Sequence, residues 1–358
     1  MAGEFQGKVV VVTGGSRGIG RAIAAAFARE GAQTVLAAAN ADNLAKSAKA
    51  IADAGGMAPL TVAADLRTLS GCEQLFKAVN EKFKRCDILV NNAGATRAGN
   101  FLEMPDEAFV DGFALKYFAA VRLSAPALLI DINGIGGLDG IARKGDMVEI
   151  GALARHAAAE RSDIISQHAP LIARAMPHIG HVAIRNRGTL GGSIAFADPA
   201  AELPACLVAL NGEVEASGPK GKRTIKADDF FKGLFETALE AQDVLTAIRV
   251  PAAAKETRIG FAELARRHGD YAIVGLAASA RADGKALKDV RLAFFGVGAT
   301  PVRAKKSEAA LANGDVEAAV AALDLNPGDD VQATGAAKKH LAGVLLRRVA
   351  KQLMEARS

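Results

Sequence analysis

Three glycines near the start of the chain have the spacing of a phosphate-binding turn. Gly14, Gly18 and Gly20 follow an apolar run over residues 8–14 and precede a helical pattern over residues 21–31, which ends at a glycine. Glycine lets a backbone approach a pyrophosphate closely, and the first turn of a helix offers N–H groups at its positive end. Strand, glycine turn and helix in this order predict a nucleotide-binding site.

The segments after this turn alternate between strand and helix. The predicted segments are strands over residues 34–38, 58–64 and 87–91 and helices over residues 41–54 and 69–84. Such alternation is typical of a parallel Rossmann-type half with right-handed crossovers. We therefore expect a nucleotide-binding half over residues 1–121, truncated after its fourth strand.

These residues resemble the short-chain dehydrogenase/reductase family, through Thr-Gly-Gly-Ser-Arg-Gly-Ile-Gly at residues 13–20 and Asn-Asn-Ala-Gly at residues 91–94. The resemblance implies NAD(P) binding by Gly14, Ser16, Arg17, Gly18, Ile19, Gly20, Asp65, Asn91, Ala93 and Gly94. The second strand ends in Ala-Ala-Asn at residues 38–40, without the acid that NAD-selective enzymes place on the ribose. NADP is therefore favoured over NAD.

The proton-transfer residues of that family are missing. The family uses a Tyr with a Lys four residues later, but the only tyrosines here, Tyr117 and Tyr271, are followed at that spacing by Val121 and Gly275. The family also has Asn where this chain has Ala114. Hydride transfer to a carbonyl needs a proton donor held beside it, so we expect no carbonyl reductase activity.

From about residue 122 the sequence resembles a different family, the FAD-carrying medium subunit of molybdenum hydroxylases of the carbon-monoxide and xanthine dehydrogenase type. The most specific stretch is Ile-Arg-Asn-Arg-Gly-Thr-Leu-Gly-Gly-Ser-Ile-Ala at residues 184–195. In the family, backbone N–H groups of the Thr-x-Gly-Gly turn contact the FAD diphosphate, at a site that needs small residues. The resemblance places Thr189, Gly191, Gly192 and Ser193 there.

The resemblance implies two further FAD contacts. Glu202 would lie near the ribose or adenine, and Tyr271 would lie against the isoalloxazine ring, where an aromatic side chain can shield one face. The alternative for Tyr271 is that it caps the apolar strand over residues 272–280. The family's Ala-Gly-Gly-x-Ser turn, the other half of its diphosphate grip, is missing. Ala-Gly-Gly at residues 54–56 only echoes it, and we interpret that segment as a helix-to-strand turn.

The expected fold combines α/β and α+β classes. A truncated Rossmann-type parallel sheet comes first (residues 1–121), then a partial FAD-binding α+β subdomain (122–243), and last a three-stranded antiparallel sheet with a helical bundle (244–358). In the last part the predicted strands are residues 259–264, 272–280 and 290–298, and the predicted helices are residues 306–313, 315–323 and 333–356.

Composition excludes several classes of protein. The net charge of +5 is mild and aromatic residues are 5% of the chain, with no basic run among them, so we expect no nucleic-acid binding. No apolar run approaches the ~20 residues of a membrane helix, and the first residues lack signal-peptide features, so we expect a cytoplasmic protein that binds no membrane. Cysteines and histidines lack the spacing of a metal or iron–sulfur site. The histidines are expected to be satisfied structural residues.

Three functional hypotheses remain open. The first is an FAD electron-transfer subunit, impaired by loss of its N-terminal subdomain, that passes electrons from an iron–sulfur partner to an acceptor. Its partners would be a molybdenum-cofactor large subunit and an iron–sulfur small subunit. The second is a short-chain dehydrogenase fragment without its catalytic Tyr and Lys. The third is an inactive recombinant or artefactual fusion.

Overall fold

The computed structural model describes residues 3–94, 119, 123, 132–284 and 286–355. The chain divides into two compact units, Met1–Asp131 and Ile132–Ser358, and each is described by itself. The boundary predicted after residue 121 lies outside the described residues.

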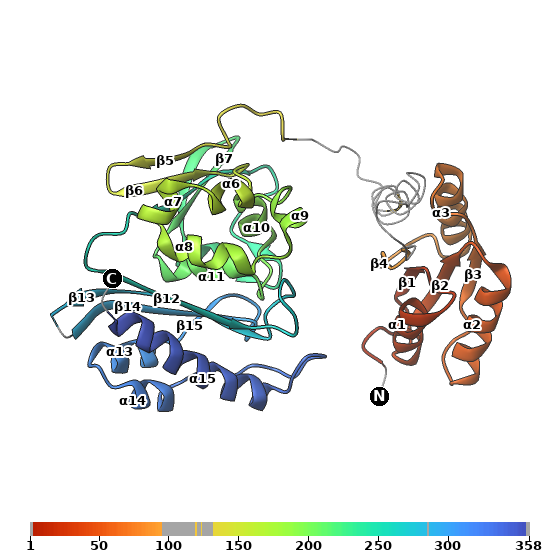
Figure 1. The fold of residues 1–358 in the computed structure, drawn as a ribbon. Coiled ribbons are helices and arrows are strands. Elements are labelled where there is room, and N and C mark those ends of the chain that lie inside the picture. Colours follow the sequence, from red (N-terminus) through yellow and green to blue (C-terminus); the bar gives the residue numbers. More distant parts are fainter. Residues whose placement is uncertain (1–2, 95–118, 120–122, 124–131, 285, 356–358) are drawn as a thin grey trace, which may run out of the picture. The chain divides into compact units, whose positions relative to one another are not determined.

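The first unit contains a four-stranded parallel sheet in the order β3-β2-β1-β4 (Figure 1). Its elements are β1 (Val9–Thr13), α1 (Gly18–Arg29), β2 (Gln33–Ala38), α2 (Ala41–Asp53), β3 (Leu60–Ala63), α3 (Leu69–Phe83) and β4 (Ile88–Val90). Successive strand residues face opposite sides of a sheet. Val9 and Val11 accordingly pack with α3 residues, while Val10 and Val12 pack with residues of α1 and α2. Helices on both faces confirm the Rossmann-type half.

One helix begins earlier than the sequence pattern predicts. Helix α1 starts at Gly18 and not at residue 21, because the last glycines of the turn form its first turn. Gly14 and Gly18 have φ angles of +67° and +55°, a conformation that side chains rarely adopt. The glycine spacing therefore shapes the turn as well as leaving room for a ligand.

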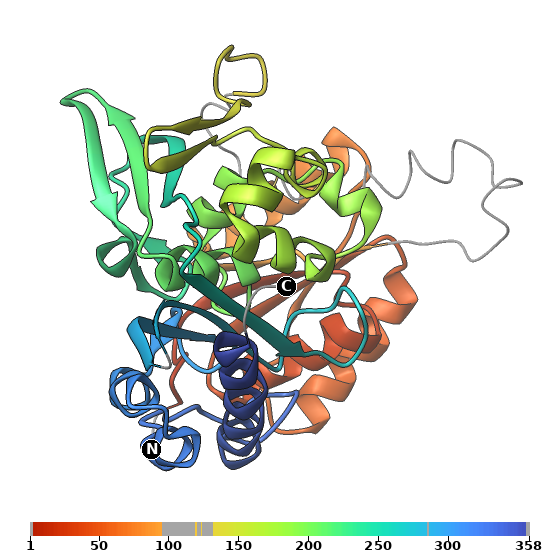
Figure 2. The same cartoon turned by 60° about the vertical axis from the view of Figure 1, so that its left-hand side comes forward.

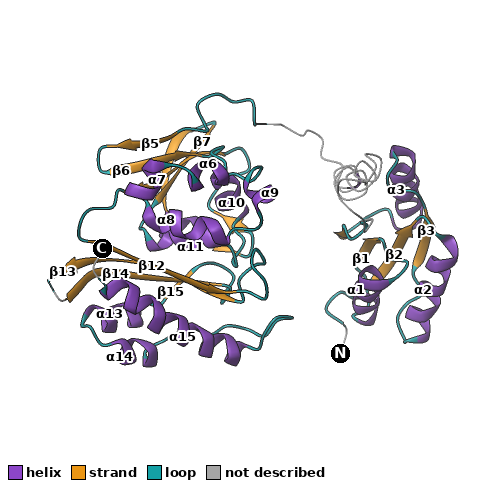
Figure 3. Ribbon diagram, in the orientation of Figure 1, coloured by secondary structure: helices purple, strands orange, loops and turns teal. Residues whose placement is uncertain are grey.

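The second unit has alternating sheets and helices (Figure 3). Its first sheet is antiparallel, in the order β5-β6-β11-β7-β8, with strands β5 (Ile141–Lys144), β6 (Met147–Gly151), β7 (Glu213–Gly218), β8 (Gly221–Lys226) and β11 (Val244–Pro251). The helices beside it are α6 (His156–Glu160), α7 (Asp163–His168), α8 (Pro170–Ala175), η3 (Met176–His178), α9 (Val182–Arg185), α10 (Leu190–Phe196) and α11 (Glu202–Ala209). Helix α12 (Ala227–Phe230) leads into the small hairpin of β9 (Phe231–Gly233) and β10 (Glu236–Thr237).

The next sheet has four strands, where the sequence predicts three. It comprises β12 (Thr257–Leu264), β13 (Val274–Asp283), β14 (Ala286–Phe295) and β15 (Val302–Arg303), all antiparallel. Strand β15 is too short to leave a periodic pattern. Helices α13 (Lys305–Ala312), α14 (Val316–Ala321) and α15 (Gly335–Met354) contribute to the core on one side of this sheet (Figure 2, blue).

Strand β11 completes the first sheet of the second unit. It pairs with β6 on one side and β7 on the other, so it is the central strand of the five-stranded sheet. This sheet therefore includes residues up to Pro251, and the domain boundary predicted after residue 243 stays a prediction. Among the described residues, no helix is long and apolar enough to cross a membrane.

Candidate functional site

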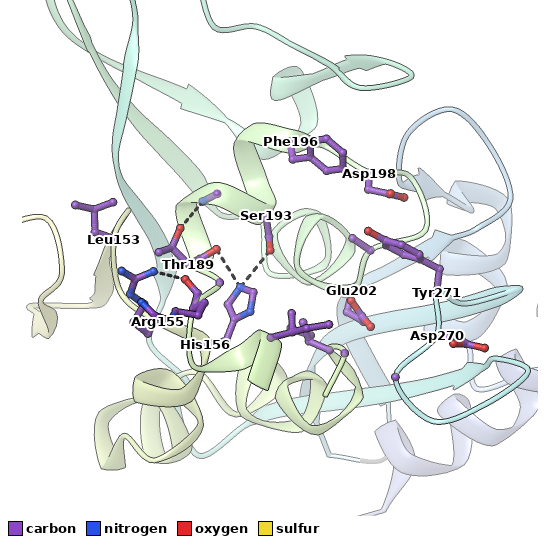
Figure 4. Close-up of a pocket in the computed structure, with 18 of the residues that line it drawn as sticks. Leu153, Arg155, His156, Thr189, Ser193, Phe196, Asp198, Glu202, Asp270 and Tyr271 are labelled. Carbon is purple, nitrogen blue, oxygen red and sulfur yellow. Dashed lines mark hydrogen bonds between the residues drawn. The ribbon is translucent and has the colours of Figure 1, made fainter. Parts of the chain in front are cut away.

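A cavity of about 580 Å³ opens in the second unit (Figure 4). Segments far apart in the sequence line it, among them the residues after β6, the loop before α10 with the first turn of that helix, the start of α11, and the loop before β13. The predicted FAD contacts Thr189, Gly192, Ser193, Glu202 and Tyr271 all line it. A volume of this size is typical of small-molecule sites.

The backbone N–H groups of the Thr-x-Gly-Gly turn already have partners. Gly191 N donates to Ala152 O over 2.9 Å, and Gly192 N donates to Thr189 Oγ1 over 3.0 Å. Thr189 is thus the N-cap of α10. The predicted contact between these N–H groups and a diphosphate therefore stays a prediction; in the structure, both groups bond within the protein.

Packing within the protein requires a small residue at position 191. Gly191 is buried and does not line the cavity, and a Cβ at this position would lie 2.6 Å from Ala152 Cα. Close packing of α10 on the end of β6 therefore requires glycine here. A Cβ at Gly192 would lie 2.7 Å from Thr189 Oγ1, so it would disturb the helix cap.

His156 joins the turn to the cavity wall. Its buried ring places Nε2 3.0 Å from Thr189 O and 3.1 Å from Ser193 Oγ, whereas Nδ1 is buried and has no hydrogen-bond partner. Burial lowers the pKa of His156, so the ring is neutral near pH 7. The expectation of a fully satisfied structural histidine is therefore wrong for Nδ1.

The two ends of the cavity differ in charge. Arg155 and Arg187 lie at the Thr189 end, and Arg155 donates to Arg187 O and, over 2.9 Å, to Asn133 Oδ1. At the Tyr271 end the lining carboxylates are Asp198, Glu202 and Asp270 (Figure 4). An elongated ligand with an anionic portion would therefore place that portion at the arginine end.

Glu202 and Tyr271 lie at the same end. Burial raises the pKa of Tyr271, and the carboxylates of Asp198 and Glu202 raise it further. The predicted roles put Glu202 at the ribose or adenine and Tyr271 at the isoalloxazine ring. Both side chains line the same cavity, and the two predicted roles stay predictions.

Glu202 is a buried acid with an unusual proton affinity. Burial, with the nearby Glu263 carboxylate as a smaller cause, raises the pKa of Glu202 to about 7. Such a group exchanges protons readily at neutral pH, which is the property expected of a general acid.

The first unit has its own cavity of about 580 Å³ at the carboxyl ends of its strands. Its lining includes the predicted residues Gly14, Ser16, Arg17, Gly18, Ile19, Gly20, Asp65, Ala93 and Gly94. Asn92 lines it, whereas the predicted Asn91 does not. Asn92 Nδ2 instead donates to Thr13 O over 3.0 Å, which ties the end of β4 to the end of β1.

Asn40 and Asp65 are the residues expected near the adenine and its ribose, and the structure shows the partners of both side chains. Asn40 accepts a hydrogen bond from Asn43 N and caps α2, so it serves the fold where an acid would serve NAD. Asp65 is paired with Arg67, whose hydrogen bonds lower the pKa of this carboxyl. The Ala-Gly-Gly segment at residues 54–56 forms the turn between α2 and β3, as predicted, with Gly55 at a φ of +85°.

Known families match both units. Residues 112–253 match the FAD binding domain in molybdopterin dehydrogenase, and residues 259–353 match the CO dehydrogenase flavoprotein C-terminal domain. The carbon monoxide dehydrogenase medium chain of Hydrogenophaga pseudoflava is 35% identical over 244 residues, which cover 66% of this chain and 85% of that protein. The chain belongs to the family of FAD-binding medium subunits of molybdenum hydroxylases.

Other members support the assignment. The nicotine 6-hydroxylase medium subunit of Paenarthrobacter nicotinovorans is 40% identical over 185 residues, and the match spans 52% of this chain and 65% of that protein. A solved carbon monoxide dehydrogenase from Hydrogenophaga pseudoflava superposes with a TM-score of 0.63 at 35% identity, over 66% of this chain and 86% of that one.

This medium-subunit family member also carries a short-chain dehydrogenase domain, matched over residues 8–138. The L-rhamnose 1-dehydrogenase (NAD(P)(+)) of Azotobacter vinelandii is 32% identical over 192 residues, 52% of this chain and 73% of that protein. The chain therefore joins parts of two oxidoreductase families, as the sequence predicts. Tyr117, Val121 and Ala114 lie outside the described residues.

Sequence reasoning missed part of the flavoprotein cavity. Arg155 and His156 lie where the chain leaves β6, and Arg187 lies within the specific motif, yet none was assigned a role. A signal was present for Arg187, because a cation two residues before a Thr-x-Gly-Gly turn suits a diphosphate. Arg155 reaches this end of the cavity only through the fold, since it lies 32 residues from Arg187 in the sequence. For His156 no local signal exists, since its partners lie more than 30 residues away.

Proposed function

We propose that residues 132–358 bind FAD in the large cavity and act as an electron-transfer unit. The observation that carries this proposal is convergence: Thr189, Gly192, Ser193 and Tyr271, all predicted as FAD contacts, come from distant segments to one cavity. Family membership adds FAD as the cofactor, and the lining suits it because cationic and aromatic groups occupy opposite ends.

The charge distribution sets the proposed orientation. Arg155 and Arg187 would hold the diphosphate with the Thr189 and Ser193 hydroxyls, and Tyr271 would cover the isoalloxazine ring. Glu202 would then lie at the ring and not at the adenine. Bound flavin supplies the redox chemistry, accepting electrons from one partner and passing them to another.

The proposed partners follow from the family. Electrons would arrive from an iron–sulfur small subunit in a complex that also holds a molybdenum-cofactor large subunit. The second half of the family's diphosphate grip is missing from this sequence, so we expect weaker FAD binding and impaired electron transfer. If the protein binds no FAD, the hypothesis of an inactive fusion of two partial oxidoreductases would be favoured.

Charge reversal at the arginine end tests this proposal. Full-length protein is titrated with FAD, and binding is followed by flavin fluorescence. Arg187→Glu should weaken binding about 10-fold or more, since an attraction to phosphate becomes a repulsion. Arg348→Glu, at an exposed position of α15, is the matched control and should bind FAD as the wild type does. Equal affinities for the two variants would refute this placement of the diphosphate.

A second proposal concerns the first unit. The turn at residues 14–20 lines a cavity with Asp65, which supports binding of the adenine portion of NADP. Without the family's Tyr and Lys we expect no NADPH-dependent ketone reduction. Calorimetry should show that an adenine nucleotide with a 2′-phosphate competes about as well as whole NADP. Saturable ketone reduction that Gly18→Val abolishes would overturn the proposal.

A further inference from the structure

We propose that His178, Glu263 and Glu202 form a proton relay from solvent to the Tyr271 end of the cavity, where Glu202 protonates the flavin during reduction. This inference rests on the proposed function. The three residues lie on three elements, η3, β12 and α11, of which α11 lines the cavity.

The geometry supplies an inner end, a middle and an outer end. Glu202 is buried and lines the cavity. Glu263 has a buried side chain whose Oε1 lies 3.2 Å from His178 Nδ1, and its Oε2 is buried without a hydrogen-bond partner. His178 has 38% of its side chain exposed, so it can exchange protons with solvent.

The unpartnered oxygen of Glu263 distinguishes this cluster from an ordinary ion pair. A buried carboxylate normally satisfies both oxygens, because an unpartnered polar atom destabilises the folded state. The free oxygen leaves Glu263 able to take a proton from His178 on one side and release it from the other. Glu202 is near enough for its charge and that of Glu263 to interact.

Charge also favours a shared proton. The charged neighbours that act on Glu202 are Glu263, His178 and Asp198, and of these only His178 can be positive. Burial, and to a smaller extent the Glu263 carboxylate, raise the pKa of Glu202 to about 7, so Glu202 can hold a proton near neutral pH. The other titratable groups that interact with the cluster are Tyr271, Cys206 and His268, and Asp270 lines the same cavity.

The proposed step balances in protons and electrons. With FAD bound, Glu202 would give up its O–H proton to the flavin, and the two electrons of the reduction would come from one-electron donors such as an iron–sulfur protein. The Glu202 carboxylate regains a proton from Glu263, Glu263 from His178, and His178 from solvent. One proton therefore enters from solvent for each pair of electrons.

Infrared spectroscopy of the flavin-free protein tests whether Glu202 holds a proton near neutral pH. In the full-length protein, a protonated carboxyl band should titrate near neutral pH. It should disappear in Glu202→Gln and shift in Glu263→Gln. Glu256→Gln, at an exposed position just before β12, is the control and should leave the band unchanged. Absence of a band titrating near neutral pH in the wild type would overturn the proposal.

Rapid-mixing reduction by dithionite tests the relay with FAD bound. Glu263→Gln and His178→Ala should slow reduction by about 100-fold at equal FAD affinity, as expected when acid–base catalysis is lost. Neither residue lines the cavity, so FAD binding should survive. Added imidazole should restore the rate of flavin reduction in the His178→Ala variant. Reduction at the wild-type rate in both variants would refute the relay, whereas wild-type protein that binds no FAD would overturn the proposed function alone.

Discussion

At the scale of single residues, Glu202 links the cavity to the pH dependence of stability. Its pKa is raised to about 7 in the folded protein, against a value of 4.5 for an ordinary glutamate. The folded state therefore binds more protons than the unfolded state between these two pH values. Stability should fall as pH rises from about 4.5 to about 7, because the folded state resists losing this proton.

Glu202→Gln removes that penalty while keeping the shape of the side chain. We expect the variant to be more stable than the wild type by up to about 2–3 kcal/mol above pH 7, and close to it below pH 4.5. Urea unfolding at several pH values measures the difference. Glu256→Gln should follow the wild type throughout, and a Glu202→Gln effect that does not vary with pH would contradict the prediction.

Gly191 gives a second prediction for a single residue. Gly191→Ala should destabilise the second unit by about 1–3 kcal/mol, the usual cost of overpacking, because the new Cβ would meet the backbone of Ala152. Gly328→Ala, at an exposed position with nothing within 4 Å of the new Cβ, serves as the control. Thermal unfolding without FAD distinguishes the two, and equal melting temperatures would disprove this packing role.

At the scale of elements, α15 protects the edge of a sheet. Strand β12 is the edge strand, and the side chain of Gln352 pairs with the backbone of Phe261: Oε1 accepts from Phe261 N over 2.9 Å and Nε2 donates to Phe261 O over 3.3 Å. A side-chain amide here takes the place of a neighbouring strand. Unpaired edge groups would otherwise be available to other chains.

Gln352→Ala should therefore cost about 1–3 kcal/mol of stability, since it leaves backbone groups of Phe261 without a partner. It should also increase aggregation on heating. Gln242→Ala, at an exposed position, should change neither property. Unfolding curves and light scattering measure both effects, and wild-type behaviour of Gln352→Ala would show that water satisfies the edge equally well.

Elements with strong local patterns are those that the sequence predicts well. The apolar run of β1 and the long period of α15 are local features, so both appear close to their predicted positions. Strand β11 was not predicted, and its partners, β6 and β7, are distant from it in the sequence. The same limit applies to the site: the glycine motifs are visible, but the partner of Gly191 N is Ala152, almost 40 residues away.

At the scale of the whole molecule, each unit has cores of its own. Among the described residues, the buried clusters of the first unit extend to residue 119, and those of the second unit begin at residue 148. Separate cores are expected to unfold separately. Calorimetry of the full chain should therefore show two transitions. NADP should raise only one of them and FAD only the other, because a ligand stabilises the part that binds it.

A single cooperative transition, or one ligand that raises both, would show that the units depend on each other. Gly18→Val supplies the internal control for assigning the peaks. It should cancel the effect of NADP and leave the effect of FAD, since Gly18 lines the cavity of the first unit.

The packing of Gly191 against Ala152 also limits what the Thr-x-Gly-Gly motif can indicate about flavin binding in related proteins. A glycine required by the fold is retained by selection for folding, even after a protein has stopped using flavin. The side chain of Arg187 is exposed, and folding does not require it. In a descendant that no longer binds flavin, this position would therefore be free to change to other residues. Among relatives that share the Thr-x-Gly-Gly signature, the arginine two residues before the threonine is therefore a better indicator of flavin binding than the glycines are.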